Sequence, residues 1–155
     1  MKIVIGNDHA GFPMKAEALD ILVKLGVEII DVGCHSADPV DFPDIALKVC
    51  QILLSGKADR AIMLCGTGVG AVMAANKYQG IRAGLCNDIY CAHQGVEHDD
   101  MNVLCMGGKL IGAWLMKEII IAFINARFDN TPDVQQRVAK LNMLGSKLPL
   151  EKKEA

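Results

Sequence analysis

Residues 60–70 have the sequence Arg60-Ala61-Ile62-Met63-Leu64-Cys65-Gly66-Thr67-Gly68-Val69-Gly70, and the architecture expected for the whole chain follows from this segment. Residues 60–65 form a short apolar run of the kind that makes a buried parallel strand. The three glycines after it permit positive φ angles and a close approach of backbone to a ligand. Residues 71–77 continue as a helix, whose first amides would face an anion. The segment therefore predicts a strand–turn–helix unit that binds phosphate or stabilises an oxyanion during a reaction.

Similar short apolar runs recur along the chain, each bounded by Gly, Asp or Asn, with amphipathic stretches between them. The expected strands are residues 2–6, 27–32, 60–65, 81–86 and 103–106, and the expected helices are residues 11–25, 42–55, 69–78, 88–97 and 109–127. This alternation predicts an α/β fold: a single Rossmann-like domain, with a five-stranded parallel sheet and helices on both faces.

A last helix is expected to begin at Thr131-Pro132-Asp133 and to run to about Leu144. Thr131 can cap it, Pro132 suits its first position, and Asp133 favours its positive end. Because this helix follows the last strand, we expect it to reach a partner subunit. We assign residues 1–145 to the domain and residues 146–155 to a charged C-terminal tail.

The composition excludes several classes of protein. The chain has 155 residues, 52% of them hydrophobic, and a net charge of −2, so it offers no basic surface for nucleic acid or an anionic membrane. It contains neither a signal peptide nor an apolar run long enough for a bilayer, and we expect a cytoplasmic protein. The six cysteines form no C-x-x-C pair, which argues against a metal site and favours reduced cysteines that mostly serve as small core residues.

Polar and glycine residues gather where the predicted strands end. These segments are Asn7-Asp8-His9, Cys34-His35, Cys65 to Gly70, Asn87-Asp88 and Gly107-Gly108-Lys109. In open parallel sheets, ligands bind at the carboxyl ends of the strands. The sequence therefore predicts a binding site at this edge of the sheet.

Cys65 lies at the mouth of a helix N-terminus, an environment that lowers the pKa of a thiol, although a buried structural cysteine is the alternative. The glycine spacing also fits a loose dinucleotide fingerprint, with Asp88 as its acid, or a purely structural turn. The position of the turn after the third strand instead of the first argues against the dinucleotide. His98, in the polar segment before the last strand, is either a surface residue or a general acid, since histidine exchanges protons near neutral pH.

Together these segments resemble one known family. The resemblance is carried by Asn7-Asp8-His9-Ala10-Gly11, Asp41-Phe42-Pro43-Asp44, Cys65 to Gly70, Ala74-Ala75-Asn76-Lys77, Gly80-Ile81-Arg82-Ala83 and His98 through Asn102-Val103-Leu104, and it extends from residue 1 to about residue 145. The sequence is similar to type B ribose-5-phosphate isomerases and galactose-6-phosphate isomerases. This similarity implies a Rossmann-like homodimer or tetramer, with a site shared between subunits, that interconverts aldose and ketose phosphates without metal or cofactor.

The resemblance also implies a role for each matching position. Cys65 would be the base that moves a proton between C1 and C2, His98 the acid–base group that opens the sugar ring, and Thr67 an assistant in ring opening or proton transfer. The amides of Gly66, Gly68, Val69 and Gly70 would hold the enediolate oxygens, Asp8 the sugar hydroxyls and His9 the phosphate. On this basis we expect Asp8, His9 and His98 to lie on loops neighbouring Cys65.

Three positions depart from the family pattern. Asp99 stands where Asn is usual, which removes an amide donor, and Lys109 stands where Arg is usual, which removes a bidentate fork. Arg137 remains, but Asp133 takes the place of a second Arg four residues before it, and Arg127 or Lys140 could substitute. Asp99, Lys109 and Arg137 remain expected substrate contacts, while the sugar itself stays open. The alternatives are a non-catalytic sugar-phosphate or nucleotide-binding module, or one subunit of a hetero-oligomeric galactose-6-phosphate isomerase.

Overall fold

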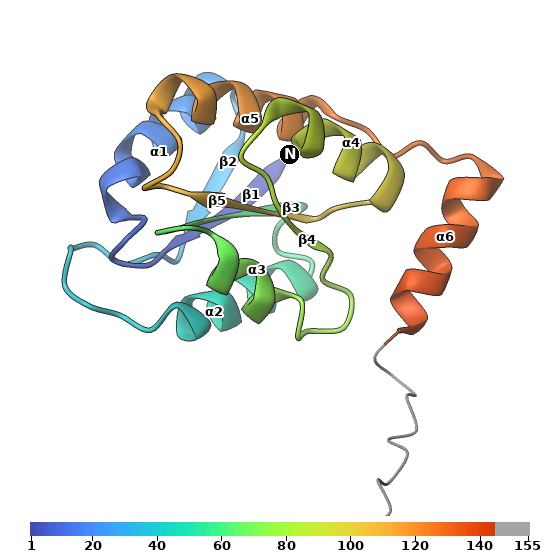
Figure 1. Ribbon diagram of the computed structural model, residues 1–155, viewed down its shortest axis with the longest axis horizontal. Helices are drawn as coiled ribbons and strands as arrows, with labels where there is room; N and C mark the ends of the chain where they lie inside the picture. Colours follow the sequence, from blue (N-terminus) through green and yellow to red (C-terminus); the bar gives the residue numbers. More distant parts are fainter. Residues whose placement is uncertain (145–155) are drawn as a thin grey trace, which may run out of the picture.

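A parallel sheet forms the centre of the molecule. The computed structural model describes residues 1–144, and Figure 1 shows the sheet between two layers of helices. Its strands are β1 (Lys2–Asn7), β2 (Glu28–Asp31), β3 (Arg60–Cys65), β4 (Ala83–Leu85) and β5 (Val103–Gly107). The order is β2-β1-β3-β5-β4, and every neighbouring pair is parallel. The predicted five-stranded parallel sheet is therefore confirmed.

Helices cover both faces of the sheet, as predicted. They are a 3₁₀ turn η1 (Phe12–Met14), α1 (Lys15–Lys24), α2 (Phe42–Leu54), α3 (Val69–Ala75), α4 (Ile89–Asp99), α5 (Ala113–Asn125) and α6 (Pro132–Met143). In Figure 1, α1, α4 and α5 lie on one face, and α2 and α3 lie on the other. The expected helix at 109–127 begins only at Ala113, because residues 107–111 form a turn in which the Leu110 and Ile111 amides donate to the Gly107 carbonyl, and Gly112 has an extended backbone (φ −84°, ψ 165°).

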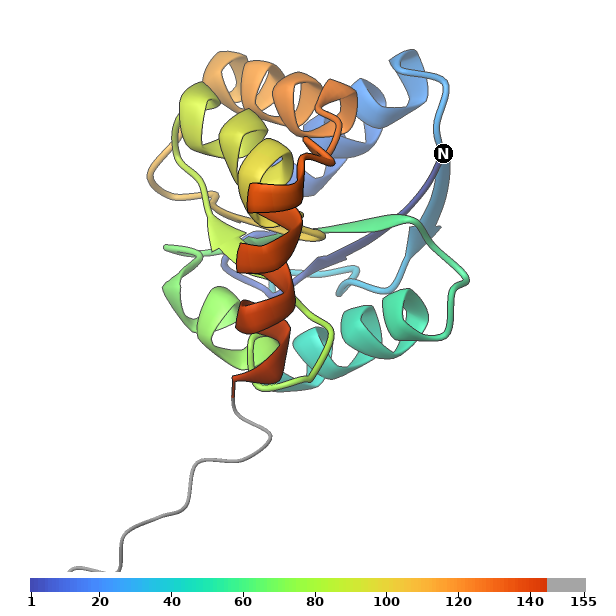
Figure 2. The ribbon, with the colours of Figure 1, turned by 90° about the vertical axis from the view of Figure 1, so that its right-hand side faces the viewer.

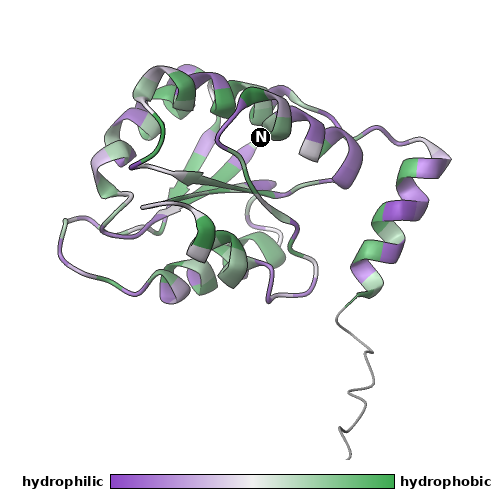
Figure 3. Ribbon diagram, viewed as in Figure 1, coloured by the Kyte–Doolittle hydropathy of each residue, from purple (hydrophilic) through white to green (hydrophobic). Residues whose placement is uncertain are grey.

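The alternation of side chains along the central strands divides the core in two. Ile3 and Ile5 of β1 face the α1, α4 and α5 layer together with Ile62 and Leu64 of β3. Val4 of β1 and the alternate residues of β3 face the α2 and α3 layer. Figure 3 shows the apolar strands between helices whose outer surfaces are more hydrophilic. Burial on both faces explains why these strands are apolar throughout.

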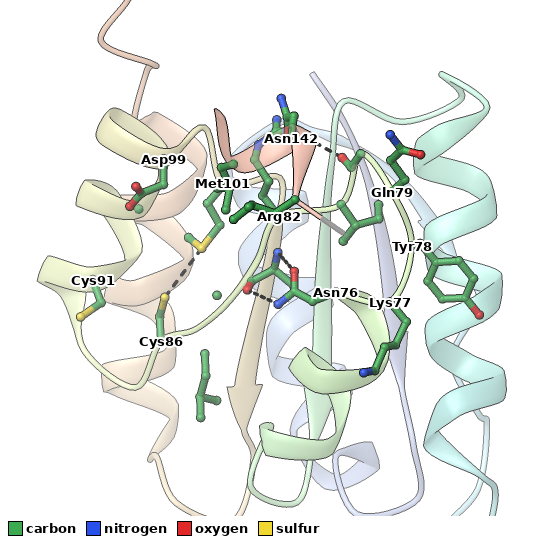
Figure 4. Close-up of a pocket in the computed structure, with 18 of the residues that line it drawn as sticks. Asn76, Lys77, Tyr78, Gln79, Arg82, Cys86, Cys91, Asp99, Met101 and Asn142 are labelled. Carbon is green, nitrogen blue, oxygen red and sulfur yellow. Dashed lines mark hydrogen bonds between the residues drawn. The ribbon is translucent and has the colours of Figure 1, made fainter. Parts of the chain in front are cut away.

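The two edge strands, β2 and β4, are shorter than the sequence predicts. Residues 27–32 and 81–86 were expected, but β2 spans Glu28–Asp31 and β4 spans Ala83–Leu85. Each of them pairs on one side only, so the ladder ends sooner than the apolar run. On the open side of β4, the Asn76 side chain accepts from the Ala83 N–H at 2.8 Å and donates to the Ala83 carbonyl at 2.9 Å (Figure 4). Asn76 thus replaces a neighbouring strand and protects this edge.

The last helix, α6, begins at Pro132 as expected, with Thr131 before it. Thr131 occupies the N-cap position, yet its side chain makes no capping hydrogen bond. Val134 and Val138 are the buried residues of α6, which contacts α4. Figure 2 shows α6 running from the α4 and α5 layer past the sheet towards the opposite layer. The tail predicted at 146–155 lies outside the described residues.

All six cysteines are free, and Cys50, Cys86 and Cys105 are buried, as expected for core residues. Within residues 1–144, no helix has the length and apolar character needed to cross a membrane.

The buried thiols predict a loss of stability at alkaline pH. Burial raises the pKa of Cys50 to about 11 and that of Cys86 to about 12, from an ordinary value of 9.0. Above pH 9 the unfolded chain releases these protons while the native protein keeps them. The free energy of unfolding should therefore fall by about 1.4 kcal/mol per pH unit for each thiol as the pH rises towards the native pKa. Urea unfolding between pH 8 and pH 11 measures this slope.

The matched control is Cys50→Ala, which lacks one of the two thiols. Its unfolding free energy should fall less steeply with pH than that of the unmodified chain. Equal slopes would contradict the assignment.

Candidate active site

Two glycine turns meet at the carboxyl ends of β3 and β5. The Gly108 N–H donates to the Cys65 carbonyl at 2.8 Å, and the Lys109 N–H donates to the Gly66 carbonyl at 3.0 Å. Gly68 has a φ of 81°, in the left-handed region that favours glycine, and it forms the N-cap of α3. A Cβ on Gly107 would lie 2.7 Å from the Thr67 carbonyl oxygen, so this contact also requires glycine. Paired backbones therefore fix the turn that follows Cys65.

The Cys65 thiol lies beside the carboxylate of Asp8. Asp8 is only 4% exposed, and one of its oxygens accepts the Gly11 N–H at 2.8 Å. Burial raises the pKa of the Cys65 thiol, and the hydrogen bond and negative charge of Asp8 raise this pKa further. The amides of Gly68 and Gly66 act in the opposite direction but are outweighed. The expectation that this thiol has a lowered pKa is therefore wrong, because burial and a carboxylate that sequence alone does not reveal outweigh the helix end.

His9 and Phe42 form the wall of the site on the α2 side. The Nδ1 atom of His9 lies 3.2 Å from the Val40 N–H and from the Val40 carbonyl, so the loop before α2 holds the imidazole. The ring of Phe42 covers Gly70, where an added Cβ would lie 2.9 Å from the nearest ring atom. Sequence reasoning gave Phe42 no role. The only signal was its place in the segment Asp41-Phe42-Pro43-Asp44.

Lys109 and Thr67 complete this group. The Lys109 side chain passes beside Gly66, with its Cδ 3.8 Å from the position of an added Cβ. The Thr67 hydroxyl accepts the Val69 N–H at 3.3 Å, and Thr67 itself is exposed. The structure thus brings together Asp8, His9, Cys65, Thr67, Lys109 and the turn from Gly66 to Gly70.

A buried polar cluster at the ends of β1 and β2 supports the site. Sequence reasoning missed this cluster. The Asn7 side chain is fully buried and donates to the Asp8 carbonyl at 3.1 Å and to the Cys34 sulfur at 3.0 Å. Lys15 donates to the Cys34 carbonyl at 2.9 Å and pairs with Asp31 at 2.7 Å. These contacts tie the ends of β1 and β2 together and so hold the backbone that carries Asp8.

Three of the predicted site residues lie elsewhere. His98 and Asp99 are in the last turn of α4, which leads through Asp100 to the amino end of β5. Asp100 pairs with Arg82, the residue that precedes the start of β4. Cys65, in contrast, ends β3, whose six residues correspond to about 16–20 Å at roughly 3.3 Å per residue. The expectation that His98 lies on a loop neighbouring Cys65 is therefore wrong within one chain (Figure 1).

Arg137 also lies away from Cys65, on α6. It is exposed, and its guanidinium is 3.8 Å from the Asp133 carboxylate in an i,i+4 pair. Asp133 thus approaches Arg137 on the surface of α6. Asp88 is likewise engaged, because its carboxylate accepts the Cys91 N–H at 2.7 Å as the cap of α4. Asp88 therefore has a structural role as the cap of α4.

A cavity of about 680 Å³ lies along the outer edge of β4, separate from the Cys65 turn (Figure 4). It is bounded by β4, the segment from Asn76 to Arg82, α4 and the end of α6. Cys86 lines it near the carboxyl end of β4, and Gln94 and Asp99 line it on α4. The cavity therefore extends along the edge between the two groups of candidate residues.

Comparison with known proteins identifies relatives over nearly the whole chain. The family described as Ribose/Galactose Isomerase matches residues 3–141. Ribose-5-phosphate isomerase B of Escherichia coli K12 is 41% identical over 143 residues, which cover 92% of this chain and 95% of that protein. D-erythrulose-4-phosphate isomerase of Pectobacterium atrosepticum is 37% identical over 133 residues, covering 83% of this chain and 86% of that protein.

Solved structures of similar sequence also share the fold of this chain. Ribose-5-phosphate isomerase B of Clostridium thermocellum has a TM-score of 0.89 and 43% identity, covering 92% of this chain and 95% of that chain. The type B ribose 5-phosphate isomerase of Trypanosoma brucei has a TM-score of 0.88 and 38% identity, covering 91% of this chain and 96% of that chain.

The contact between Asp8 and Cys65 yields a test that does not depend on activity. Asp8→Asn removes the charge that raises the pKa of the Cys65 thiol, so Cys65 should react with iodoacetamide at lower pH than in the unmodified protein. Mass spectrometry of the peptide that contains Cys65, labelled across a pH series, gives the midpoint.

Asp88→Asn is the matched control, because a hydrogen bond to Asp88 raises the pKa of Cys91. This variant should shift the labelling of Cys91 and leave that of Cys65 in place. An unchanged Cys65 midpoint in Asp8→Asn would show that the carboxylate does not control the thiol.

Proposed function

The chain belongs to the ribose/galactose isomerase family, and from this premise we propose that it interconverts an aldose phosphate and its ketose through an enediolate, with Cys65 as the base. The family consists of intramolecular oxidoreductases, and this chain is a sugar-phosphate isomerase. The observation that carries the proposal is the position of the Cys65 thiol at the end of β3, between the buried Asp8 and the turn from Gly66 to Gly70.

The proposed reaction moves two protons. The Cys65 thiolate takes the proton from C2 of the open aldose, the C2 electrons form the C1–C2 double bond, and the carbonyl oxygen on C1 becomes an enediolate oxygen. The proton on O2 passes to O1, and the thiol returns its proton to C1 to give the ketose. Thr67, an exposed residue in the same turn, would exchange the proton between O1 and O2 through its hydroxyl.

The enediolate requires donors that are already in place. The Cys65 and Gly66 carbonyls accept hydrogen bonds from the Gly108 and Lys109 amides, which hold the start of the turn from Gly66 to Gly70. The amides of this turn would therefore need little reorganisation when charge develops. Lys109, whose side chain lies over Gly66, adds a positive charge at the same place. Asp8 would accept hydrogen bonds from sugar hydroxyls, and His9 would contact the phosphate.

The remaining candidates require a second copy of the chain. His98, Asp99 and Arg137 lie towards the amino end of the sheet, so they cannot reach a sugar held by Cys65 of their own chain. The cavity along β4 is lined by exposed apolar side chains, among them Leu85 at 36%, Leu141 at 42% and Leu144 at 70%. A two-fold axis through this edge and perpendicular to the strands would reverse the strand direction in the second copy. The partner subunit's His98 would then approach the first copy's Cys65.

Ring opening would be the task of the partner subunit's His98. In that step the bond between C1 and the ring oxygen breaks, the ring oxygen gains a proton, and the C1 hydroxyl loses one. The substrate is proposed to be ribose 5-phosphate or another small sugar phosphate. A relative named for D-erythrulose 4-phosphate shows that the family handles more than one chain length. His9 in this chain and Arg137 from the partner subunit would share the phosphate.

Removing the base should abolish proton exchange. With Cys65→Ala, we expect isomerisation and C2–deuterium exchange in heavy water to fall by at least the 10²–10⁴-fold that general acid–base groups contribute. NMR of ribose 5-phosphate, D-erythrulose 4-phosphate and a panel of other sugar phosphates measures both. Cys91→Ala, which removes an exposed thiol, is the control and should stay active. Retained exchange in Cys65→Ala would remove Cys65 from its role.

Mixing two inactive variants tests whether the site is shared. In a heterodimer of Cys65→Ala and His98→Ala chains, one site combines both losses and the other has both native residues. Random association from equal amounts should restore about a quarter of the native activity. The measurement is turnover of ribose 5-phosphate after co-refolding, compared with each variant alone. Activity that never exceeds the mean of the separate variants would place both residues in one chain.

A further inference from the structure

On helix α4, two histidines each pair with the residue one helical turn away. The partner of His93 is a hydrogen-bond acceptor, whereas the partner of His98 is a donor. The Nδ1 atom of His93 lies 2.9 Å from a carboxylate oxygen of Glu97. The Nδ1 atom of His98 lies 2.9 Å from the side-chain amide nitrogen of Gln94. A carboxylate can only accept, so Nδ1 of His93 carries a hydrogen. An amide nitrogen can only donate, so Nδ1 of His98 is the acceptor.

We propose that Gln94 is a positioning residue that keeps neutral His98 in the tautomer with its hydrogen on Nε2. The inference rests on the proposed function, because it assigns a chemical form to the histidine that opens the ring. Since the Gln94 amide occupies the lone pair of Nδ1, the Nε2–H is the only hydrogen that the neutral ring can offer. Gln94 fixes the orientation of the ring through the same bond.

The surroundings of the pair match this role. Gln94 and Asp99 line the cavity along β4, where the second copy is proposed to pack, and His98 between them is exposed. Nε2–H is therefore available to a sugar bound by the other subunit. Its hydrogen bond to the ring oxygen would polarise the bond from that oxygen to C1. The ring oxygen then takes up the proton that the C1 hydroxyl releases, and the imidazole ends as it began.

Replacing Gln94 should change the tautomer in a defined direction. Gln94→Met keeps the length of the side chain but removes the donor, and should give a mixture of tautomers. Gln94→Glu supplies only acceptors, as Glu97 does for His93, and should place the hydrogen of His98 on Nδ1. Nitrogen-15 NMR of protein labelled at histidine, recorded where the imidazoles are neutral and assigned with His98→Gln, distinguishes the two forms.

Glu97→Gln is the matched control on the same helix. It should alter the tautomer of His93 and leave that of His98 unchanged. A hydrogen on Nδ1 of His98 in the unmodified protein, or an unchanged tautomer in Gln94→Glu, would overturn the inference whatever the activity of the enzyme.

The kinetic test separates ring opening from proton transfer. Ribose 5-phosphate is a cyclic sugar, whereas D-erythrulose 4-phosphate has no fifth carbon whose hydroxyl could close a furanose ring on the C2 carbonyl. The O4 of its aldose isomer carries the phosphate, so that isomer cannot close a furanose ring either. Gln94→Glu should slow turnover of ribose 5-phosphate by about tenfold, roughly the contribution of one hydrogen bond to the ring oxygen, and leave turnover of D-erythrulose 4-phosphate unchanged. Equal losses on both substrates would indicate a structural role and reject the positioning role. Activity retained by Cys65→Ala would instead count against the proposed function, and the NMR result for Gln94 would still stand.

Discussion

The backbone contact between the turns that follow β3 and β5 is the constraint on which the rest of the site depends. The Gly108 and Lys109 amides donate to the Cys65 and Gly66 carbonyls, so the polypeptide after Cys65 cannot move without breaking main-chain hydrogen bonds. Glycine is needed at Gly107 because a side chain would collide with the Thr67 carbonyl oxygen. This contact also carries the Lys109 side chain over Gly66. One interaction therefore fixes the base, the proposed oxyanion donors and a positive charge together.

The pKa of the Cys65 thiol is raised, whereas a reactive cysteine is usually expected to have a lowered pKa. Burial and the Asp8 carboxylate raise the pKa of the thiol more than the Gly66 and Gly68 amides lower it. The resting site thus favours the protonated thiol, which protects it from the reactions of an exposed thiolate. A sugar whose hydroxyls donate to Asp8 would weaken the hold of this carboxylate on Cys65 and make the proton easier to remove. On the proposed function, substrate binding and activation of the base would then be one event.

The sequence was sufficient for the layers of the fold, because parallel strands buried on both faces must be apolar throughout and the glycine turns end them clearly. It overestimated the edge strands, since hydropathy does not reveal that β2 and β4 pair on one side only. It also placed the cluster of Asp8, His9 and Cys65 at one edge, which follows from strand direction. What it could not supply were contacts between distant segments: Asp8 against Cys65, Phe42 over Gly70, and the tie between Asn7 and Cys34. The assignment of His98 to a neighbouring loop failed for a topological reason.

That topological reason extends to the assembly. A crossover helix that leaves the carboxyl end of one parallel strand must return to the amino end of the next, so the two ends of α4 lie at opposite ends of the sheet. Cys65 belongs to one end and His98 to the other, and no rearrangement of loops within this fold could join them. If both groups act on one sugar, the second copy must present its amino end to the first. The cavity along β4, with its exposed apolar border, offers the surface for that arrangement. Dimerisation would then be a requirement of the chemistry that follows from helix direction alone.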